Sequence, residues 1–449
     1  ERAASFAAHT VDGPLADSLA AHVRRARGTP DSGFETFAAE WRDRFPALDR
    51  AVSLLLASAD ARAEDRERGL DRALDAVLDG TRDELATFAA DVRGPTTGVY
   101  AFGVLLPLAL VGVLPAARAG GVSVPTAAFV AVYDLLLPAG LVAASAWILL
   151  RRPVALAPPR VDAAHPDVPS SLLPAGLVAV VAAGVGWVVG ATVAPWADAL
   201  TAVGAGVGSG LVARYYPMAR VRARVRAVED GLDDVLSLVG RRVTAGDSVE
   251  VAVESAADAV STPAGDVFAD AAGVRRRLRV GVREAFLGRY GVLSDLPSPR
   301  ARSAAALLAV AATEGRPAGQ AVVATADHLR ELRRVESEAR RELASVTGTL
   351  SNTAALFAPL VGGATVAMAA RMGAAETALV EGGAGTLGPS LLGVAVGAYV
   401  LALAVVLTAL STGLDRGLDR TLVGYRVGLA LLSATAAYLA AFRGAALVF

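Results

Sequence analysis

The sequence contains no cysteine and no lysine, and each absence excludes a class of chemistry. Without cysteine there are no disulfides and no metal sites built on thiolates. Without lysine there is no Walker A side chain to hold nucleotide phosphates and no amine to form a Schiff base. All 43 side chains that carry a permanent positive charge are therefore arginines.

Histidine is scarce as well. The four histidines, His9, His22, His165 and His328, are far apart in the sequence, and none has the spacing of a metal-ligand pair. Glycines at 186, 190, 204, 206, 208 and 210 lie within apolar segments, where small residues let helices approach closely, so we favour packing over nucleotide binding. We expect solvated or structural histidines, and no catalytic residue, cofactor, metal or nucleic-acid partner.

The charges are unevenly distributed along the chain. The 449 residues are 54% hydrophobic and 19% charged, and the mean hydropathy is +0.48. Residues 1–97 hold 13 arginines and 18 acidic residues, and residues 214–345 hold 21 arginines and 18 acidic residues. The rest of the chain holds only 9 arginines and 8 acidic residues. This segregation predicts an all-α, polytopic membrane protein with two charged helical blocks.

Seven apolar segments are long enough, or nearly so, to cross a hydrocarbon core about 30 Å thick. They lie near 98–117, 126–150, 171–193, 197–213, 347–370, 390–411 and 425–442. They divide the chain into a first cytoplasmic helical domain (1–97), membrane helices 1–2 (98–150), a cytoplasmic linker (151–170), membrane helices 3–4 (171–213), a second cytoplasmic helical bundle (214–346) and membrane helices 5–7 (347–449).

The arginines orient these spans. Both charged blocks, the linker with Arg151, Arg152 and Arg160, and the loop near Arg416 to Arg426 are expected on the cytoplasmic side, because arginine-rich loops stay inside. With seven spans in the cell membrane, the N-terminus is cytoplasmic and the C-terminus is outside.

Helical periodicity is clearest in the second block. Apolar residues recur every three or four positions at Val221, Val225, Val228, Leu232, Val235, Leu236 and Val239, with charges between them. Asp233 and Asp234 fall on the polar side, so we interpret them as part of a solvated face. Gly246 predicts a helix stop, and Asp247 with Glu250 predicts a capped start after it; Gly315 and Pro317 predict another stop and start.

The first block is a shorter version of the second. Thr81 and Glu84, just after Gly80, predict a helix start before the first membrane span. Both blocks end in Glu-Leu-Ala, at 84–86 and 342–344, and both are followed by an aromatic residue and a membrane proline: Phe102 with Pro107, and Phe357 with Pro359. The match needs a gap, and it suggests an internal duplication.

Residues 221–370 resemble the inner-membrane platform proteins of type II secretion, type IV pilus, tight-adherence and archaellum machines, the type II secretion system F domain family. The resemblance is carried by the helix ending at Arg241-Arg242, the Ala-Gly-Asp-Ser turn at 245–248, the Glu-Gly-Arg-Pro turn at 314–317, the long helix through Leu343 and the span with Phe357 and Pro359. Residues 1–120 resemble the family more weakly. The additional spans at 171–213 are similar to archaeal members, whereas the short first copy departs from the family pattern.

The resemblance implies an oligomeric scaffold without enzymatic activity, which couples a cytoplasmic hexameric secretion ATPase to the insertion of pilin-like subunits from the membrane. A secondary transporter is the alternative, because seven spans, proline-broken helices and a repeat are also typical of transporters. Two charged blocks totalling about half the chain favour the scaffold.

The densest positive cluster consists of Arg275, Arg276, Arg277, Arg279 and Arg283. Consecutive residues on a helix are about 100° apart, so these side chains cannot all face the bundle core. They could be a solvated or lipid-attracted tip. The functional hypothesis is that they bind an acidic surface of the ATPase.

Asp134 is a charged residue within the second span. It lies four residues before Pro138, whose missing N–H leaves the Asp134 carbonyl without its helical partner. An acid near the outer interface, hydrated or bonded to a neighbouring helix, is the structural interpretation. A carboxylate that couples ions or protons is the functional one, although no second membrane charge is placed to complete a relay.

Overall fold

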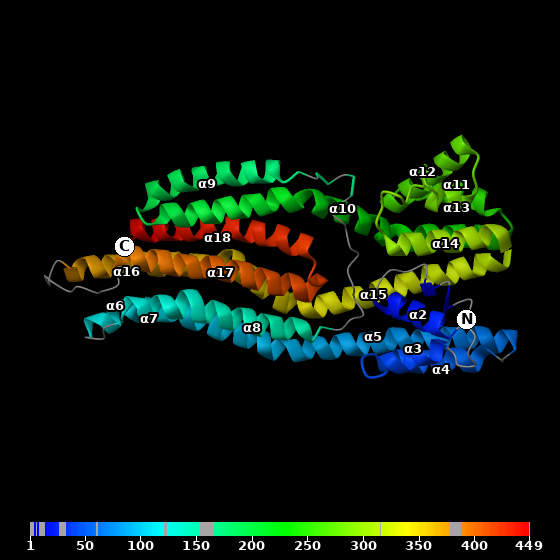
Figure 1. Ribbon diagram of the computed structural model, residues 1–449, viewed down its shortest axis with the longest axis horizontal. Coiled ribbons are helices and arrows are strands. Elements are labelled where there is room, and N and C mark those ends of the chain that lie inside the picture. The colour runs from blue at the N-terminus through cyan, green and yellow to red at the C-terminus, as the bar shows by residue number, and fades with distance from the viewer. Residues whose placement is uncertain are drawn as a thin grey trace. The chain divides into compact units, whose positions relative to one another are not determined.

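The computed structural model describes residues 4–5, 7–8, 14–26, 33–59, 62–120, 124–152, 165–166, 168–169, 171–314, 316–377 and 388–448. Within these ranges all regular structure is helical, as the sequence predicts (Figure 1). The chain forms two compact units. Unit 1 comprises residues 1–86, 159–166 and 220–339, and unit 2 comprises residues 87–158, 167–219 and 340–449. Most of both charged blocks therefore belongs to one unit, and the apolar segments belong to the other, which also holds residues 87–97, 214–219 and 340–345.

Four helices form the N-terminal part of unit 1: α2 (Pro14–Arg25), α3 (Gly33–Trp41), α4 (Pro46–Ala59) and α5 (Ala63–Tyr100), of which residues 63–86 are in this unit. Leu19, Val23, Phe37 and Trp41 form their small buried core. The predicted helix start after Gly80 is wrong, because α5 is continuous there and the Thr81 hydroxyl donates to the Val77 carbonyl at 2.8 Å.

Gly80 has a packing role instead of a terminating one. A Cβ built there would lie 2.1 Å from the Cβ of Ala47, so only glycine allows α4 to approach α5 this closely.

The second part of unit 1 is a bundle of α10 (Ala197–Ala245, from residue 220), α11 (Val249–Ala259), α12 (Pro263–Leu278), α13 (Val282–Leu287), α14 (Pro299–Glu314) and α15 (Arg316–Asn352, to residue 339). The predicted stripe on α10 is confirmed, since all seven apolar side chains from Val221 to Val239 are buried. Burying a side chain of this size contributes roughly 1.5–3 kcal/mol.

The start of α11 differs from the prediction by one residue. Gly246 has a φ of 115°, which confirms the left-handed stop. The N-cap is Ser248, whose hydroxyl accepts the Val251 N–H at 3.4 Å, while Asp247 pairs with Arg242 at 3.3 Å. A serine and an aspartate are both good caps, so the sequence alone does not separate the two positions. Gly315, the other predicted stop, lies outside the described residues, between α14 and α15.

Unit 2 contains the apolar helices. They are the end of α5 with α6 (Leu106–Ala119), α7 (Thr126–Val130) with α8 (Leu137–Leu150), α9 (Leu173–Val193), the start of α10, the end of α15 with α16 (Ala358–Thr377), α17 (Pro389–Arg416) and α18 (Arg420–Val448). Helices α16, α17 and α18 pack against one another (Figure 1). Among the described residues, six helical stretches are long and apolar enough to cross a membrane, so the chain has the character of a membrane protein. Residues 197–213, the fourth predicted span, are not among the six.

Glycines bring α9, α10 and α18 close together. On one face of α10, a Cβ at Gly206 would lie 2.8 Å from the Cβ of Ala183, and a Cβ at Gly210 would lie 2.9 Å from that of Ala179, both on α9. On the other face, a Cβ at Gly204 would lie 2.1 Å from the Oγ1 of Thr435, and a Cβ at Gly208 would lie 2.9 Å from the Cγ of Leu432, both on α18. The prediction that these glycines serve helix packing is confirmed.

A short π-helical turn precedes each of three prolines in unit 2. The turns are η1 (Ala101–Leu105), η2 (Ala131–Leu136) and η3 (Thr353–Phe357), and Pro107, Pro138 and Pro359 each lie two residues after the end of a turn. A proline ring collides with the carbonyl four residues before it, and a wider turn relieves that collision.

Two of the carbonyls freed by these prolines receive hydrogen bonds from neighbouring helices. Pro107 cannot donate to Gly103, and the Tyr399 hydroxyl donates to the Gly103 carbonyl instead. Pro359 cannot donate to Ala355, and the Ser433 hydroxyl donates to that carbonyl at 2.9 Å. Because a hydrocarbon interior offers no water to such groups, these bonds fix α17 and α18 against the broken helices.

Candidate functional site

The arginine cluster singled out in the sequence lies where α12 ends and α13 begins. Arg275, Arg276 and Arg277 form the last turn of α12, where positive charge complements the helix dipole. Arg279 follows with a φ of 53°, a left-handed conformation that ends the helix and turns the chain toward α13. Arg283 is exposed in the first turn of α13.

One of the five arginines is engaged inside unit 1. Arg275 is 25% exposed and pairs with Glu254 of α11. Arg276 also approaches Glu254, at 3.7 Å, but is 65% exposed. The other three are exposed, and Leu278 between them is 52% exposed. We call Arg276, Arg277, Arg279 and Arg283 the arginine tip; it presents four positive charges beside an apolar side chain.

A second set of charges in unit 1 is buried and structural. Asp233 is only 1% exposed and pairs with Arg330 at 3.3 Å and with Arg333 at 3.1 Å, both from α15. The interpretation of Asp233 as part of a solvated face is therefore wrong, whereas Asp234 is exposed as expected. These ion pairs hold α10 against α15, and the loss of one buried partner typically costs 3–5 kcal/mol.

Glu229 lies in the same interface. Its side chain is 9% exposed, Ser298 donates to one carboxylate oxygen at 2.6 Å, and Arg300 lies 3.9 Å from the other. Burial, only partly offset by Ser298 and Arg300, raises the pKa of the Glu229 carboxyl above its ordinary value. Glu229 thus has a perturbed pKa, but its neighbours are the bundle core rather than a cleft.

Asp134 lies in the π turn η2, beside Tyr133. Tyr133 is buried and donates to the Pro107 carbonyl at 2.7 Å. One Asp134 oxygen, Oδ1, is buried and has no hydrogen-bond partner within the part of the chain that the structure describes. Neither the hydrogen bond to a neighbouring helix nor a relay partner is therefore found for this oxygen.

The histidines do not form a metal site within the described residues, and no group of three or more potential ligands is present there. His22 is buried and bonds the Ser18 carbonyl at 2.9 Å, and it also lies 3.1 Å from Glu40. His165 contacts the Asp295 carbonyl at 2.9 Å. His9 lies outside the described residues.

No protein-family model, curated protein or solved structure matches this chain.

Proposed function

We propose that this chain is the membrane assembly platform of a type IV pilus-like or type II secretion-like machine. The observation that carries the proposal is the continuity of three long helices, α5, α10 and α15, which each contain residues of both units. Helices shared by the two units connect the charged bundle directly to the apolar one, although Pro95 and Pro217 lie inside two of them. A scaffold driven by a cytoplasmic ATPase needs this kind of link.

The duplication is part of the proposal. Helix α5 has 38 residues and continues through the five-residue turn η1 into α6, and α15 has 37 residues and continues through the five-residue turn η3 into α16. The π turns and their prolines are separated by the same offset of 252 residues (353 minus 101, and 359 minus 107). Phe102 and Phe357 (357 minus 102, which is 255) and the Glu-Leu-Ala triplets (342 minus 84, which is 258) do not share that offset, so these parts of the sequence match need the gap.

Seven spans are also proposed. Helices α9 and α10 form a hairpin with a short turn at 194–196. Residue 186 is close to 201, residue 183 to 206 and residue 179 to 210, so the two helices run antiparallel. If α9 crosses a membrane, residues 197–213 return across it. Their hydropathy is low because glycine is scarcely apolar, but glycine is what this close packing requires.

The arginine tip is the proposed docking site for the ATPase. Four arginines that are not held by the bundle core can form bidentate bonds with carboxylates, and Leu278 adds apolar area beside them. Long-range attraction would also speed the encounter with an acidic partner.

A test replaces Arg276, Arg277 and Arg283 together by glutamate. Arg275 is left in place because it pairs with Glu254. We expect at least about tenfold less ATPase to co-purify with the detergent-solubilised protein, because like charges now meet across the interface. A control with Arg224, Arg241 and Arg302 replaced by glutamate changes the net charge equally on other exposed positions and should retain the ATPase. Equal retention by both variants would contradict docking at the tip.

The same purification tests the function itself. We expect the unaltered chain, taken from its native membrane in mild detergent, to retain a hexameric ATPase and pilin-like subunits. Retention of neither would count against the platform. The transporter alternative is favoured by one observation, the unpartnered oxygen of Asp134. It would gain support from solute or ion flux into proteoliposomes that Asp134→Asn abolishes.

A further inference from the structure

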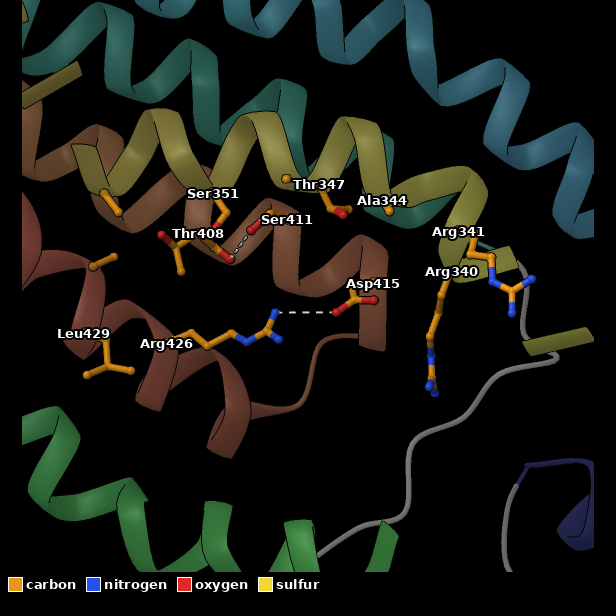
Figure 2. Close-up of a pocket in the computed structure, with 13 residues that line it drawn as sticks. Arg340, Arg341, Ala344, Thr347, Ser351, Thr408, Ser411, Asp415, Arg426 and Leu429 are labelled. Atoms are coloured by element: carbon orange, nitrogen blue, oxygen red, sulfur yellow. Dashed lines mark hydrogen bonds and ion pairs between the residues drawn. The ribbon is translucent and has the colours of Figure 1, made fainter. Parts of the chain in front are cut away.

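A pocket of about 700 Å³ lies between α15, α17 and α18, all within unit 2 (Figure 2). On α15, Arg340, Ala344, Thr347 and Ser351 recur at intervals of three and four residues, which places them on one face of the helix. This volume is within the range of small-molecule binding sites. The pocket is not part of the arginine tip, and no feature of the proposed function uses it.

One end of the pocket is strongly positive. Arg340, Arg341 and Arg426 line it, together with Asp415. Asp415 is shared by two arginines, Arg426 at 3.5 Å and Arg416 at 3.0 Å, and Figure 2 shows Arg426 directed toward it. Asp415 therefore orients the Arg426 guanidinium within the pocket lining.

Arg152 adds to this positive field from the end of the second apolar segment. Its guanidinium interacts electrostatically with both Asp415 and Arg340, and burial lowers its pKa. The acidic residues close in sequence to the lining arginines are Glu336, which pairs with Arg300, Glu338, which pairs with Arg334, and Glu342 and Asp419. Three arginines against one carboxylate in the pocket lining leave an excess of positive charge that favours an anion.

Hydroxyl groups line the deeper wall. Thr408 and Ser411, on α17, are 4% and 3% exposed. The Ser411 hydroxyl donates to the Thr408 carbonyl at 3.2 Å, but the Thr408 hydroxyl itself has no hydrogen-bond partner within the described residues. Thr365 and Thr435 donate to the carbonyl four residues earlier, whereas the buried hydroxyls of Thr353 and Thr412 also have no partner within the described residues. Because this oxygen is buried, the Thr408 hydroxyl donates to a ligand oxygen only once the side chain turns toward the pocket.

The other end of the pocket is apolar. Ala355, Leu429 and Ala430 line it, and Leu429 is 44% exposed. These residues belong to helical stretches that are long and apolar enough to cross a membrane. A ligand that fills the whole pocket thus has an anionic head and an apolar tail.

We propose that this pocket binds the phosphate headgroup of an anionic phospholipid. The arginines bind the phosphate oxygens, the Thr408 hydroxyl donates to a headgroup oxygen, and an acyl chain lies along Ala355, Leu429 and Ala430. Basic pockets between membrane helices bind lipid headgroups in this way. A soluble phosphate compound would share the headgroup chemistry but would leave the apolar end of the pocket unfilled.

The test measures bound lipid in the full-length chain. The protein is reconstituted into nanodiscs of phosphatidylglycerol mixed with phosphatidylcholine, extracted in mild detergent, and analysed by native mass spectrometry. We expect phosphatidylglycerol to remain bound. Arg341→Gln with Arg426→Gln should weaken its binding about 25-fold, at about fivefold per arginine. Arg302→Gln, an exposed arginine of unit 1, is the matched control and should leave binding unchanged.

Thr408→Val tests the hydroxyl separately, because it keeps the shape of the side chain and removes only the donor. We expect weaker phosphatidylglycerol retention with an unchanged melting temperature. Equal retention by wild type and all variants, or equal retention of phosphatidylcholine, would overturn the proposal. Displacement of the lipid by millimolar inorganic phosphate would overturn the lipid assignment in favour of a soluble phosphate ligand, and an acidic peptide found in the pocket by cross-linking would also overturn it.

Discussion

At the scale of single residues, burial of apolar side chains follows from the sequence, but burial of charges does not. The stripe from Val221 to Val239 is predictable because helical periodicity is a local property. Asp233 lies on the polar side of the same helix and is nevertheless buried, because Arg330 and Arg333 reach it from α15. A contact between residues so far apart in the sequence leaves no periodic signal.

The basic pocket escaped the sequence interpretation for the same reason. Its arginines come from the ends of separate helices, and only the fold brings Arg340 and Arg341 near Asp415 and Arg426. A weak signal was present, since Thr408, Ser411 and Asp415 recur on one face of a helix that is otherwise apolar. Polar residues in line on a membrane helix indicate a contact that lipid does not supply.

Glu229 allows a pH prediction at this scale. Because burial raises its pKa in the folded state, its contribution to stability is present below the ordinary value of 4.5 and is lost as the pH rises through the folded pKa. Glu229→Gln resembles the protonated form. Relative to wild type, it should therefore gain melting temperature at about pH 7.5 and lose that advantage as the pH falls toward about 5.

Thermal unfolding of the detergent-solubilised protein at several pH values checks this prediction. Glu314→Gln, at an exposed position, is the control and should shift the melting temperature equally at each pH. A stabilising effect of Glu229→Gln that grows with falling pH would show that the sign is wrong.

At the scale of elements, the all-helical class and six apolar helices agree with the sequence, but helix ends are less well predicted. Gly80 illustrates the difficulty, since glycine is both the commonest helix stop and the residue that lets two helices touch. The sequence pattern Gly80, Thr81, Glu84 predicts a stop, and close contact with Ala47 gives the actual reason for the glycine. Local rules do not distinguish the two when the partner is unknown.

The glycines of α10 allow a prediction about packing. Gly204→Leu with Gly208→Leu should lower the melting temperature or dissociate α18 from α10, because even a Cβ at these positions meets Thr435 and Leu432 at 2.1 and 2.9 Å. Single interhelical contacts contribute on the order of 1 kcal/mol, and a clash between helices costs more. Differential scanning fluorimetry and size-exclusion chromatography in detergent measure the effect.

A matched control lies on the neighbouring helix. A Cβ at Gly184 of α9 meets no atom within 4 Å, so Gly184→Leu should leave melting temperature and size unchanged. If the double variant on α10 behaved like this control, the close packing of α10 against α18 would be refuted.

At the scale of the whole molecule, composition predicts the division into a charged part and an apolar part, which the two units reproduce. It does not predict that most of both charged blocks belongs to the same unit. Arg82 of α5 pairs with Glu331 and lies 4.0 Å from Glu338, both on α15, so the blocks share ion pairs. Two charged blocks that pack together look, in the sequence, like two independent domains.

The number of membrane crossings is the last prediction. Topology reporters after Gly121, Arg160, Val335 and Val448 should report outside, inside, inside and outside, which corresponds to seven spans. The decisive reporter site is Val335, because it lies on the same side of the membrane as Arg160 only if residues 197–213 cross the membrane. Their antiparallel packing along α9, with Gly206 against Ala183 and Gly210 against Ala179, requires that crossing if α9 spans the membrane. An outside signal at Val335 would mean six spans, and it would place the arginine tip where no cytoplasmic ATPase could reach it.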